Sequence, residues 1–336
     1  MSLNTLEEIA SYIVSDGKGI LAADESNPTC TKRFDTIGVE STEESRRDYR
    51  EMLFRSGGIQ GNIGGVILFD ETIRQNAKDG TSLVDLMNSQ GALPGIKVDK
   101  GLQPIGDSDE TVTVGLEGLD ERLKEYSLLG AKFTKWRAVI KIGNNLPTDN
   151  CIDANMKALA DYAKVVQDNG MVPMVEPEVL MEGDHSIEEC FAASERSLKS
   201  LFHHLKENGV NIKGTILKPN MVTAGSTCSN QASINEVAEQ TLECLRANVP
   251  SELPAITFLS GGQSELLATA HLDAMNKIGG FDWKLSFSFG RALQAPTLKA
   301  WMGKPENVFI AQDALSHRAK MNQLAALGEW DKGLED

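Results

Sequence analysis

GKGILAADES, residues 17–26, is the segment that is most informative about the fold class. Its Ile-Leu-Ala-Ala run is typical of a short buried strand, and polar residues follow it directly. An open, doubly wound sheet would be expected to carry a G-x-G-x-x-G motif after its first strand. Acidic residues stand here instead, where backbone amides would have to meet a pyrophosphate. The segment therefore favours a closed parallel barrel, with the open sheet as the alternative.

Seven further segments of this kind follow, each rich in β-branched or small residues and each ending in polar or glycine-rich sequence. They are NIGGVILFDE (62–71), PGIKVDKG (94–101), KFTKWRAVIKI (132–142), MVPMVEPEV (171–179), GTILKPNMV (214–222), AITFLSGG (255–262) and KLSFSFGR (284–291). The amphipathic stretches between them carry helix-start signals S/T-x-x-E at Thr5, Ser41, Ser186 and Ser233, and helix stops at Asn169-Gly170 and Asn208-Gly209. A spacing of roughly 30 to 45 residues suits one strand–helix unit. We expect an α/β protein: one (β/α)8 TIM-barrel domain over residues 1–336, with a short N-terminal helix and a C-terminal tail.

The composition is that of an ordinary globular protein, with 336 residues, 41% of them hydrophobic and 24% charged. No apolar run approaches the ~18 residues that a membrane span requires, and the N-terminus lacks the basic region and apolar core of a signal peptide. The five cysteines are scattered, odd in number and never form a C-x-x-C pair. This pattern predicts reduced thiols in a cytoplasmic protein with no membrane partner.

The formal net charge of −15 opposes binding of polyanions over the general surface, so we expect no nucleic-acid partner. Any phosphate ligand must then be held by a local cluster of cations. The five histidines show no ligand grouping beyond the adjacent pair His203-His204, which falls on a predicted helix and is interpreted as surface or packing. We therefore expect no metal and no cofactor.

Charged residues recur at the predicted carboxyl ends of the strands, where the chemistry of a (β/α)8 barrel takes place. They are Asp24, Lys97, Lys135, Arg137, Glu176, Glu178, Lys218 and Arg291. Side chains two apart on a strand share a face, so Lys135 lies beside Arg137 and Glu176 beside Glu178. Two cations and two anions in one confined space can compensate each other. An ion-pair scaffold of the barrel mouth is the alternative that involves no catalysis.

Lys218 is the best candidate for a nucleophile, because it follows the apolar Ile216 and Leu217 and precedes a proline that ends the strand. A lysine attacks a carbonyl only as the free amine, and an unperturbed lysine is almost wholly protonated at neutral pH. Burial and nearby cations such as Lys135 would disfavour the charged form. Schiff-base chemistry also needs a proton shuttle, for which Glu176 or Glu178 is suitably placed.

Two other sets of strand-end residues predict phosphate binding. The first offers hydroxyls, close-approaching glycines and a guanidinium after strands seven and eight, the recurrent phosphate site of this fold: Ser260, Gly261, Gly262, Ser288, Gly290 and Arg291. The second set, near strands one and three, is Ser26, Thr29, Arg33 and Lys97. Two anion sites on opposite rims imply a substrate phosphorylated at both ends.

At this point the motifs GKGILAADES, GIKVDKG, KFTKWRAV, VEPEV, LKPNMV, FLSGGQSE and SFGRALQ resemble the class I fructose-bisphosphate aldolases, in order, from about residue 5 to 325. The resemblance implies a (β/α)8 barrel assembled as a homotetramer. It also implies reversible cleavage of fructose 1,6-bisphosphate to the triose phosphates dihydroxyacetone phosphate and glyceraldehyde 3-phosphate, without a metal.

The resemblance implies a role for each matching residue. Lys218 is similar to the Schiff-base lysine, Glu176 to the proton-transfer group, and Asp24 to the carboxylate that takes the C4 hydroxyl proton. The remaining residues resemble the charge network around the imine (Lys135, Arg137, Glu178), the C1-phosphate cradle (Ser260, Gly261, Gly262, Gly290, Arg291, with Ser288 beside it) and the C6-phosphate side (Ser26, Thr29, Arg33, Lys97).

This sequence departs from the family pattern at two places. Many members have serine where Thr29 stands, and the hydroxyl is kept. Many eukaryotic members end in a flexible tail whose terminal tyrosine assists proton exchange at C3, whereas this sequence ends EWDKGLED. Either another acid–base group is expected to handle that proton, or this step is expected to be slow.

Three alternative functions remain beside the aldolase interpretation. A phosphosugar isomerase on the same barrel would use Glu176 as base and a lysine as electrophile, and would form no covalent adduct. A metal-dependent aldolase is disfavoured by the scattered histidines. A non-catalytic phosphosugar-binding protein would lack the lysine or the glutamate, and both are present. The preference among fructose 1,6-bisphosphate, fructose 1-phosphate and sedoheptulose 1,7-bisphosphate stays open at this point.

Overall fold

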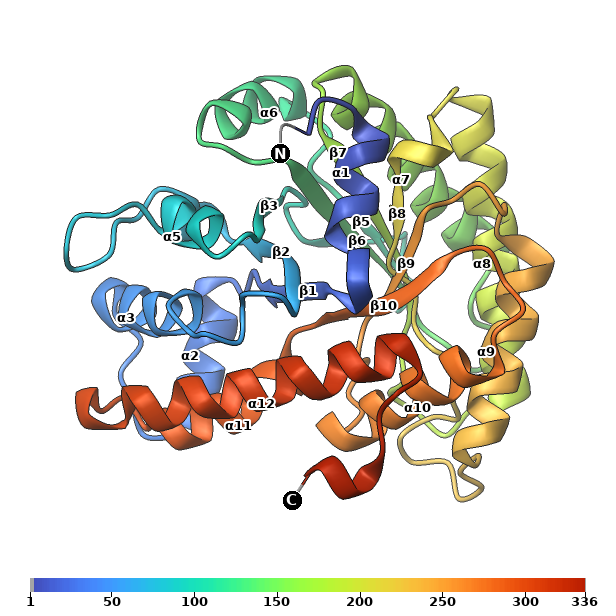
Figure 1. Cartoon of the computed structure of the whole chain (residues 1–336). Helices are drawn as coiled ribbons and strands as arrows, with labels where there is room; N and C mark the ends of the chain where they lie inside the picture. Colours follow the sequence, from blue (N-terminus) through green and yellow to red (C-terminus); the bar gives the residue numbers. More distant parts are fainter. Residues whose placement is uncertain (1–2, 336) are drawn as a thin grey trace.

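The computed structural model describes residues 3–335 and contains a closed barrel of parallel strands in the order β1-β10-β9-β8-β7-β6-β3-β2 (Figure 1). The barrel strands are β1 (Gly19–Ala23), β2 (Ile63–Leu68), β3 (Leu93–Lys97), β6 (Phe133–Ile140), β7 (Val172–Val179), β8 (Ile216–Leu217), β9 (Ala255–Phe258) and β10 (Lys284–Phe289). Each lies within, or one residue outside, a segment predicted from the sequence. The (β/α)8 prediction is confirmed, and the open-sheet alternative is excluded.

Helices surround the barrel (Figure 1). They pack on the outward side chains of its strands. They are α2 (Asn27–Asp35), α3 (Glu43–Phe54), α4 (Asp70–Ile73), α5 (Leu83–Ser89), α6 (Leu119–Leu128), α7 (Asp149–Asp168), α8 (Ile187–Glu207), α9 (Ile234–Asn248), α10 (Glu265–Ile278), α11 (Arg291–Trp301) and α12 (Val308–Leu327). Buried outward residues such as Trp136, Val175 and Phe258 belong to this large outer core. Among residues 3–335, no helix combines the length and the apolar character that crossing a membrane would take.

The short N-terminal helix α1 (Leu6–Ile13) lies across one end of the barrel (Figure 1). Its Ile9, Ala10 and Ile13 form a second apolar cluster with inward side chains from the starts of the strands, including Phe133 and Val172. The contact is close, because a Cβ added at Gly64 would lie 2.1 Å from the carbonyl oxygen of Ile13. Helix α1 therefore closes the end of the barrel at which the strands begin and leaves their carboxyl ends open.

Most of the helix-boundary signals are confirmed. Thr5, Ser186 and Ser233 each form a capping box with the glutamate three residues later. Helices α7 and α8 end at the predicted Asn-Gly pairs, where Gly170 and Gly209 adopt positive φ angles of 73° and 64°.

The prediction for Ser41 is wrong by one residue. The N-cap of α3 is Thr42, whose side chain accepts a hydrogen bond from the backbone N–H of Ser45. The hydroxyl of Ser45 in turn accepts from the backbone N–H of Thr42, 2.9 Å away. A serine at the third helical position thus replaces the glutamate that the sequence motif requires, because its hydroxyl also reaches back to the cap.

Two features of the strands differ from expectation. The segment 214–222 is strand only at Ile216 and Leu217, because Pro219 has no N–H to continue the ladder. A two-stranded antiparallel hairpin, β4 (Leu102–Pro104) with β5 (Thr111–Thr113), follows β3 and has no counterpart in the sequence prediction. Its strands are short and mostly exposed, so they lack the apolar signal of a buried strand.

Four short 3₁₀ turns complete the described chain: η1 (Ser15–Gly17), η2 (Ile212–Gly214), η3 (Pro305–Asn307) and η4 (Lys332–Glu335). The last of these holds the C-terminal tail against the outer helices. Glu335 forms an ion pair with the buried Arg318 of α12 and accepts a hydrogen bond from Trp330 Nε1 at 2.9 Å.

Candidate active site

Four charged side chains from four strand ends meet in the open mouth of the barrel. Lys218 Nζ lies 3.1 Å from Oε1 of Glu176, and Lys135 Nζ lies 3.0 Å from Oε2 of the same carboxylate. Lys135 Nζ also donates a hydrogen bond to Oδ2 of Asp24 at 3.1 Å. Lys218, Lys135 and Glu176 are 4%, 5% and 3% exposed. Together with Asp24, these groups carry two positive and two negative charges, and this compensation makes the burial tolerable.

The chain around Lys218 is held by hydrogen bonds to strand β7. The backbone N–H of Lys218 donates to the carbonyl of Val175 at 2.8 Å. Where Pro219 interrupts the ladder, the side chain of Asn220 takes over, since its Oδ1 accepts from the N–H of Val179 at 3.0 Å. The segment after β8 is therefore fixed against β7, the strand that carries Glu176.

Burial and the neighbouring charges act in opposite directions on this cluster. Burial opposes ionisation of Asp24, but the ammonium groups of Lys135, Lys218 and Lys97 outweigh it and lower the pKa of the carboxyl to about 2. Burial also opposes ionisation of Glu176, and Lys135 and Lys218 lower its pKa nonetheless. Burial disfavours the charged form of Lys135, yet Asp24 and Glu176 raise its pKa. Both carboxyl groups are therefore ionised at neutral pH.

Arg137 and Glu178 form a second ion pair beside the first. Burial opposes the charged form of Arg137, and Glu178 raises its pKa nonetheless. Lys97, at the end of β3, lies with its Nζ 2.6 Å from Oδ1 of Asp99. The expected compensation between the cations of β6 and the anions of β7 is present, with one lysine shared by two carboxylates.

The loop after β9 and the turn after β10 meet at the rim of the mouth. Gly261 and Gly262 adopt positive φ angles of 58° and 95°. A Cβ added at Gly262 would lie 3.5 Å from Nη2 of Arg291, so the guanidinium lies against the loop. Arg291 is the first residue of α11 and Gly290 is its N-cap, so the N-terminus of a helix also faces this rim.

Two polar groups in this region have no partner among residues 3–335. Arg291 forms no ion pair within residues 3–335. The hydroxyl of Ser288 is buried and makes no hydrogen bond in the same part of the chain. A helix N-terminus, exposed loop amides and an uncompensated guanidinium together suit an anion such as a phosphate group.

Helix α2 brings Thr29 and Arg33 to the same rim, which differs from the expected grouping. A Cβ added at Gly290 would lie 3.7 Å from Nη2 of Arg33. A cavity of about 730 Å³ between α2 and α11 is lined by Thr29, Arg33 and Arg291 among others. The expected second anion site is thus divided, because two of its four members face Arg291 across this cavity.

The other two members, Ser26 and Lys97, line a separate cavity of about 570 Å³. Further cations of that cavity are Arg74, Lys100 and Arg122. Ser26 and Thr29, which line one cavity each, lie side by side at the start of α2, with their hydroxyls 3.1 Å apart. Polar side chains therefore extend along the barrel mouth from Arg291 past Thr29 and Ser26 to Lys97.

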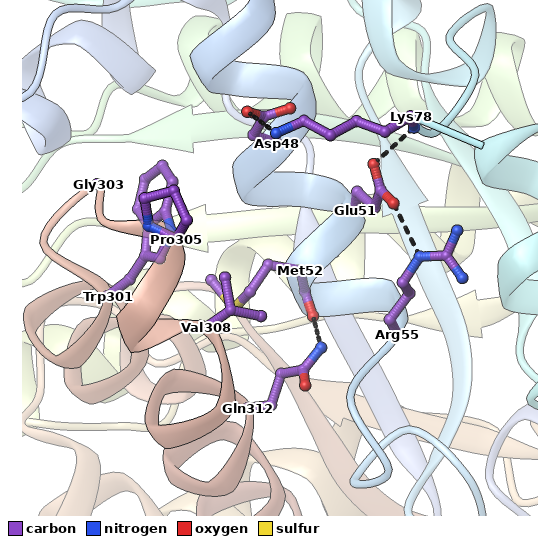
Figure 2. Close-up of a pocket in the computed structure, with 10 residues that line it drawn as sticks. All are labelled: Asp48, Glu51, Met52, Arg55, Lys78, Trp301, Gly303, Pro305, Val308 and Gln312. Carbon is purple, nitrogen blue, oxygen red and sulfur yellow. Dashed lines mark hydrogen bonds and ion pairs between the residues drawn. The ribbon is translucent and has the colours of Figure 1, made fainter. Parts of the chain in front are cut away.

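Another hollow, of about 160 Å³, lies on the outer helices between α3 and the ends of α11 and α12 (Figure 2). Its apolar floor is formed by Met52, Trp301 and Val308. The charged residues on its rim are paired with each other: Lys78 Nζ lies 2.8 Å from Asp48, and Arg55 Nε lies 2.8 Å from Glu51. Because these charges are already compensated, this hollow does not suit a phosphorylated ligand.

Several residues that shape the site were not identified from the sequence. Glu25 is 8% exposed and forms ion pairs with both Arg33 and Arg50, so it holds Arg33 in place. Asp99 pairs with Lys97 as described above. Glu25 follows the predicted Asp24 in ADES, and Asp99 lies two residues after the predicted Lys97 in KVDK, and these positions were the available signal. Asn220 and Gln263 carried no signal of their own.

The histidine pair expected at the surface lies on α8. His203 is exposed, and His204 Nε2 lies 2.8 Å from Oδ1 of Asp153. Within residues 3–335, no three histidine, cysteine, aspartate or glutamate side chains are grouped as metal ligands.

Comparisons with known proteins identify the family. The family model described as "Fructose-bisphosphate aldolase class-I" matches residues 5–336. A probable fructose-bisphosphate aldolase class 1 of Xanthomonas axonopodis pv. citri is 52% identical over 98% of this chain and 99% of its own length. The cytosolic fructose-bisphosphate aldolase 4 of Arabidopsis thaliana is 50% identical over 95% of this chain and 82% of its own.

A solved structure agrees as well. The fructose-bisphosphate aldolase of Plasmodium falciparum, in a ternary complex with TRAP and a small-molecule inhibitor, superposes with a TM-score of 0.96 at 47% identity. The match covers 98% of this chain and 95% of that one. The similarity thus includes the whole barrel and the strand ends described above. The chain belongs to the class I fructose-bisphosphate aldolase family.

Proposed function

We propose that the protein cleaves fructose 1,6-bisphosphate reversibly to dihydroxyacetone phosphate and glyceraldehyde 3-phosphate through a Schiff base on Lys218. The observation that carries the proposal is the buried contact of Lys218 and Lys135 with the two oxygens of one carboxylate, Glu176, at 3.1 and 3.0 Å. The names of the relatives support the choice of substrate.

The first step needs Lys218 as a free amine, and Glu176 is the group placed to accept its proton. If the proton moves from Lys218 Nζ to Oε1 of Glu176, both groups become neutral and the ion pair of Lys135 with Asp24 remains. The cluster has no net charge before or after the transfer, so burial does not penalise the change. The free amine then attacks the C2 carbonyl to form a carbinolamine.

The second step is loss of water from the carbinolamine. The proton held by Glu176 returns to the departing hydroxyl group, and an iminium ion is left on Lys218. Lys135, which stays charged beside the same carboxylate, favours the ionised form of Glu176 once the proton has left.

Bond cleavage follows, with Asp24 as the base. Its carboxylate takes the proton of the C4 hydroxyl, the C3–C4 bond breaks, and the electron pair moves into the iminium to give an enamine. A carboxylate with a pKa of about 2 is a weak base, so we infer that substrate binding must draw Lys135 away from Asp24 before this step. Protonation at C3 and hydrolysis then release the second triose phosphate.

Each phosphate group of the substrate is assigned to a different part of the barrel mouth. Ser260, Gly261, Gly262, Gly290 and Arg291, with Ser288, would bind the C1 phosphate. Ser26 and Lys97 would bind the C6 phosphate, with Thr29 and Arg33 between the two. Arg137 and Glu178 would support the iminium from the side. Arg33 is placed between the two sets because its guanidinium lies beside the Gly290 turn.

Borohydride trapping tests the proposal. The protein is incubated with dihydroxyacetone phosphate, reduced with sodium borohydride and digested, and the adduct is located by mass spectrometry. We expect it on Lys218, with none in Lys218→Met and an unchanged yield in Lys213→Met, which removes an exposed lysine. An active wild-type protein without an adduct would instead support an isomerase or a metal-dependent reaction, and phosphate binding without turnover a non-catalytic protein.

We also propose a homotetramer in the cytoplasm. The five unpaired cysteines, four of them buried, are consistent with a reducing compartment. Light scattering after size-exclusion chromatography measures the mass of the assembly, and a mass near 36.5 kDa, that of one chain, would reject the tetramer.

A further inference from the structure

His271 on α10 is buried, with 2% of its surface exposed. Its Nδ1 lies 2.6 Å from Oε1 of Gln263. Gln263 is the residue that follows the loop Ser260-Gly261-Gly262, and it is 9% exposed. A buried imidazole is thus in contact with the residue that ends the loop proposed to hold the C1 phosphate.

Gln263 closes this loop with two hydrogen bonds. Its backbone N–H and its side-chain Nε2 each donate to the carbonyl of Ser260 at 3.0 Å. Nε2 also lies 3.6 Å from Sδ of Met221, three residues after Lys218. The side chain of Gln263 therefore joins the first residue of the loop to the segment that carries the proposed nucleophile.

The direction of each hydrogen bond follows from the Ser260 carbonyl, which can only accept. The amide nitrogen of Gln263 must face it, so the amide oxygen faces His271 and the imidazole must donate from Nδ1. Burial lowers the pKa of His271 to about 4, so the ring is neutral at pH 7. Its Nε2 is then unprotonated and has no partner within residues 3–335. The imidazole thus makes one hydrogen bond, and that bond fixes Gln263.

We propose that His271 is a positioning residue for phosphate binding: through Gln263 it holds the Ser260 carbonyl and keeps residues 260–262 in the shape that exposes their amides. The inference rests on the proposed function, because that function assigns the C1 phosphate to this loop. The two glycines make such support necessary, since their backbone is the least restricted of any residue and would otherwise sample many shapes.

Three variants test the link. His271→Leu removes the donor, Gln263→Met removes the amide, and His271→Asn keeps a donor, because its Nδ2 can take the place of the imidazole Nδ1. We expect His271→Leu and Gln263→Met each to raise the KM for fructose 1,6-bisphosphate and the Ki of inorganic phosphate by about five- to tenfold, the effect of one lost hydrogen bond. The kcat should stay within about twofold, since the Lys218 cluster is untouched.

Two comparisons between variants distinguish a positioning role of His271 from a loss of protein stability. His271→Asn should restore the KM to within about twofold, and the double variant His271→Leu/Gln263→Met should be no worse than either single variant, because all three lose the same connection. His203→Leu, which replaces an exposed histidine of α8, is the matched control and should match the wild type. Thermal melting of each protein identifies any variant that does not fold, and the remaining single variant then carries the comparison.

Several results would overturn the inference. These are an unchanged KM in His271→Leu, additive effects in the double variant, a folded His271→Asn as impaired as His271→Leu, or a fall in kcat alone. If the wild-type protein neither cleaves the bisphosphate nor binds inorganic phosphate, the proposed function itself fails and this inference falls with it. Normal wild-type turnover with unaffected variants would reject only the positioning role.

Discussion

Replacement of Lys135 by methionine tests the electrostatic basis of the site. Lys135 is 5% exposed and is shared by Asp24 and Glu176. Without it, the buried Glu176 and the half-buried Asp24 remain with Lys218, and the ion-paired cluster carries a net charge of −1. Removing one partner of a buried ion pair costs about 3–5 kcal/mol. Lowering the pKa of Asp24 from 3.8 to about 2 accounts for roughly 2 kcal/mol of this at neutral pH.

The pH dependence of the loss is the sharper part of this prediction. In the wild type, the pKa of Asp24 is lower folded than unfolded, so its contribution is complete above pH 3.8 and is lost as the pH falls toward 2. In the variant, the carboxylates have lost their main cation, and protonating them at mildly acidic pH relieves the unpaired charge. The difference in unfolding free energy between the two proteins should therefore be largest near neutrality and shrink by at least about 1 kcal/mol near pH ~4.5.

Urea unfolding followed by circular dichroism, at both pH values, measures this difference. Lys157→Met is the matched control, because Lys157 also pairs with an aspartate, at 2.6 Å, but its side chain is 59% exposed. An exposed pair contributes about 0–1 kcal/mol, so the control should lose little. The reasoning is refuted if Lys135→Met loses no more than the control, or if its loss is the same at both pH values.

Three further predictions concern the other groups of the mouth. Glu176→Gln should lower kcat by about 100-fold or more while the bisphosphate Kd stays within about threefold, as measured by steady-state kinetics and equilibrium dialysis; equal losses would mean that Glu176 is structural. Arg291→Ala should raise the KM for fructose 1,6-bisphosphate by about 10- to 100-fold, the usual effect of a lost charge-assisted hydrogen bond, and an unchanged KM would remove Arg291 from the phosphate site. Glu25→Leu should destabilise the protein by about 3–5 kcal/mol in urea, because Arg50 is left buried without its carboxylate, and a loss below ~1 kcal/mol would contradict this.

The barrel and its central cluster could be predicted from the sequence because both depend on local patterns. Short apolar strands ending in charged residues appear directly in the chain, and the fold itself brings strand ends such as Lys135, Glu176 and Lys218 together. The hairpin Leu102–Pro104 with Thr111–Thr113 was not predicted, because its strands are short and largely exposed.

The contacts made by loops and helices could not be predicted in the same way. Arg33 reaches the Gly290 turn because α2 packs beside α11, and that packing is settled by side chains far apart in the sequence. The link from His271 to Gln263 crosses from a helix face to a loop, eight residues apart, and neither residue type suggests the other. The positions of residues at strand ends thus follow from the barrel topology. The contacts of Arg33 and His271 depend instead on how helices and loops pack.

Helix α1, which closes the far end of the barrel, has a kinetic consequence. Because Ile9 and Ile13 block that end, substrate would enter and products would leave through the open mouth of the barrel. Both products of the proposed cleavage would therefore have to leave through this one opening. Under the proposed function, a covalent bond to Lys218 would hold one fragment while the other leaves. Product release should accordingly be strictly sequential, with the untethered aldehyde first.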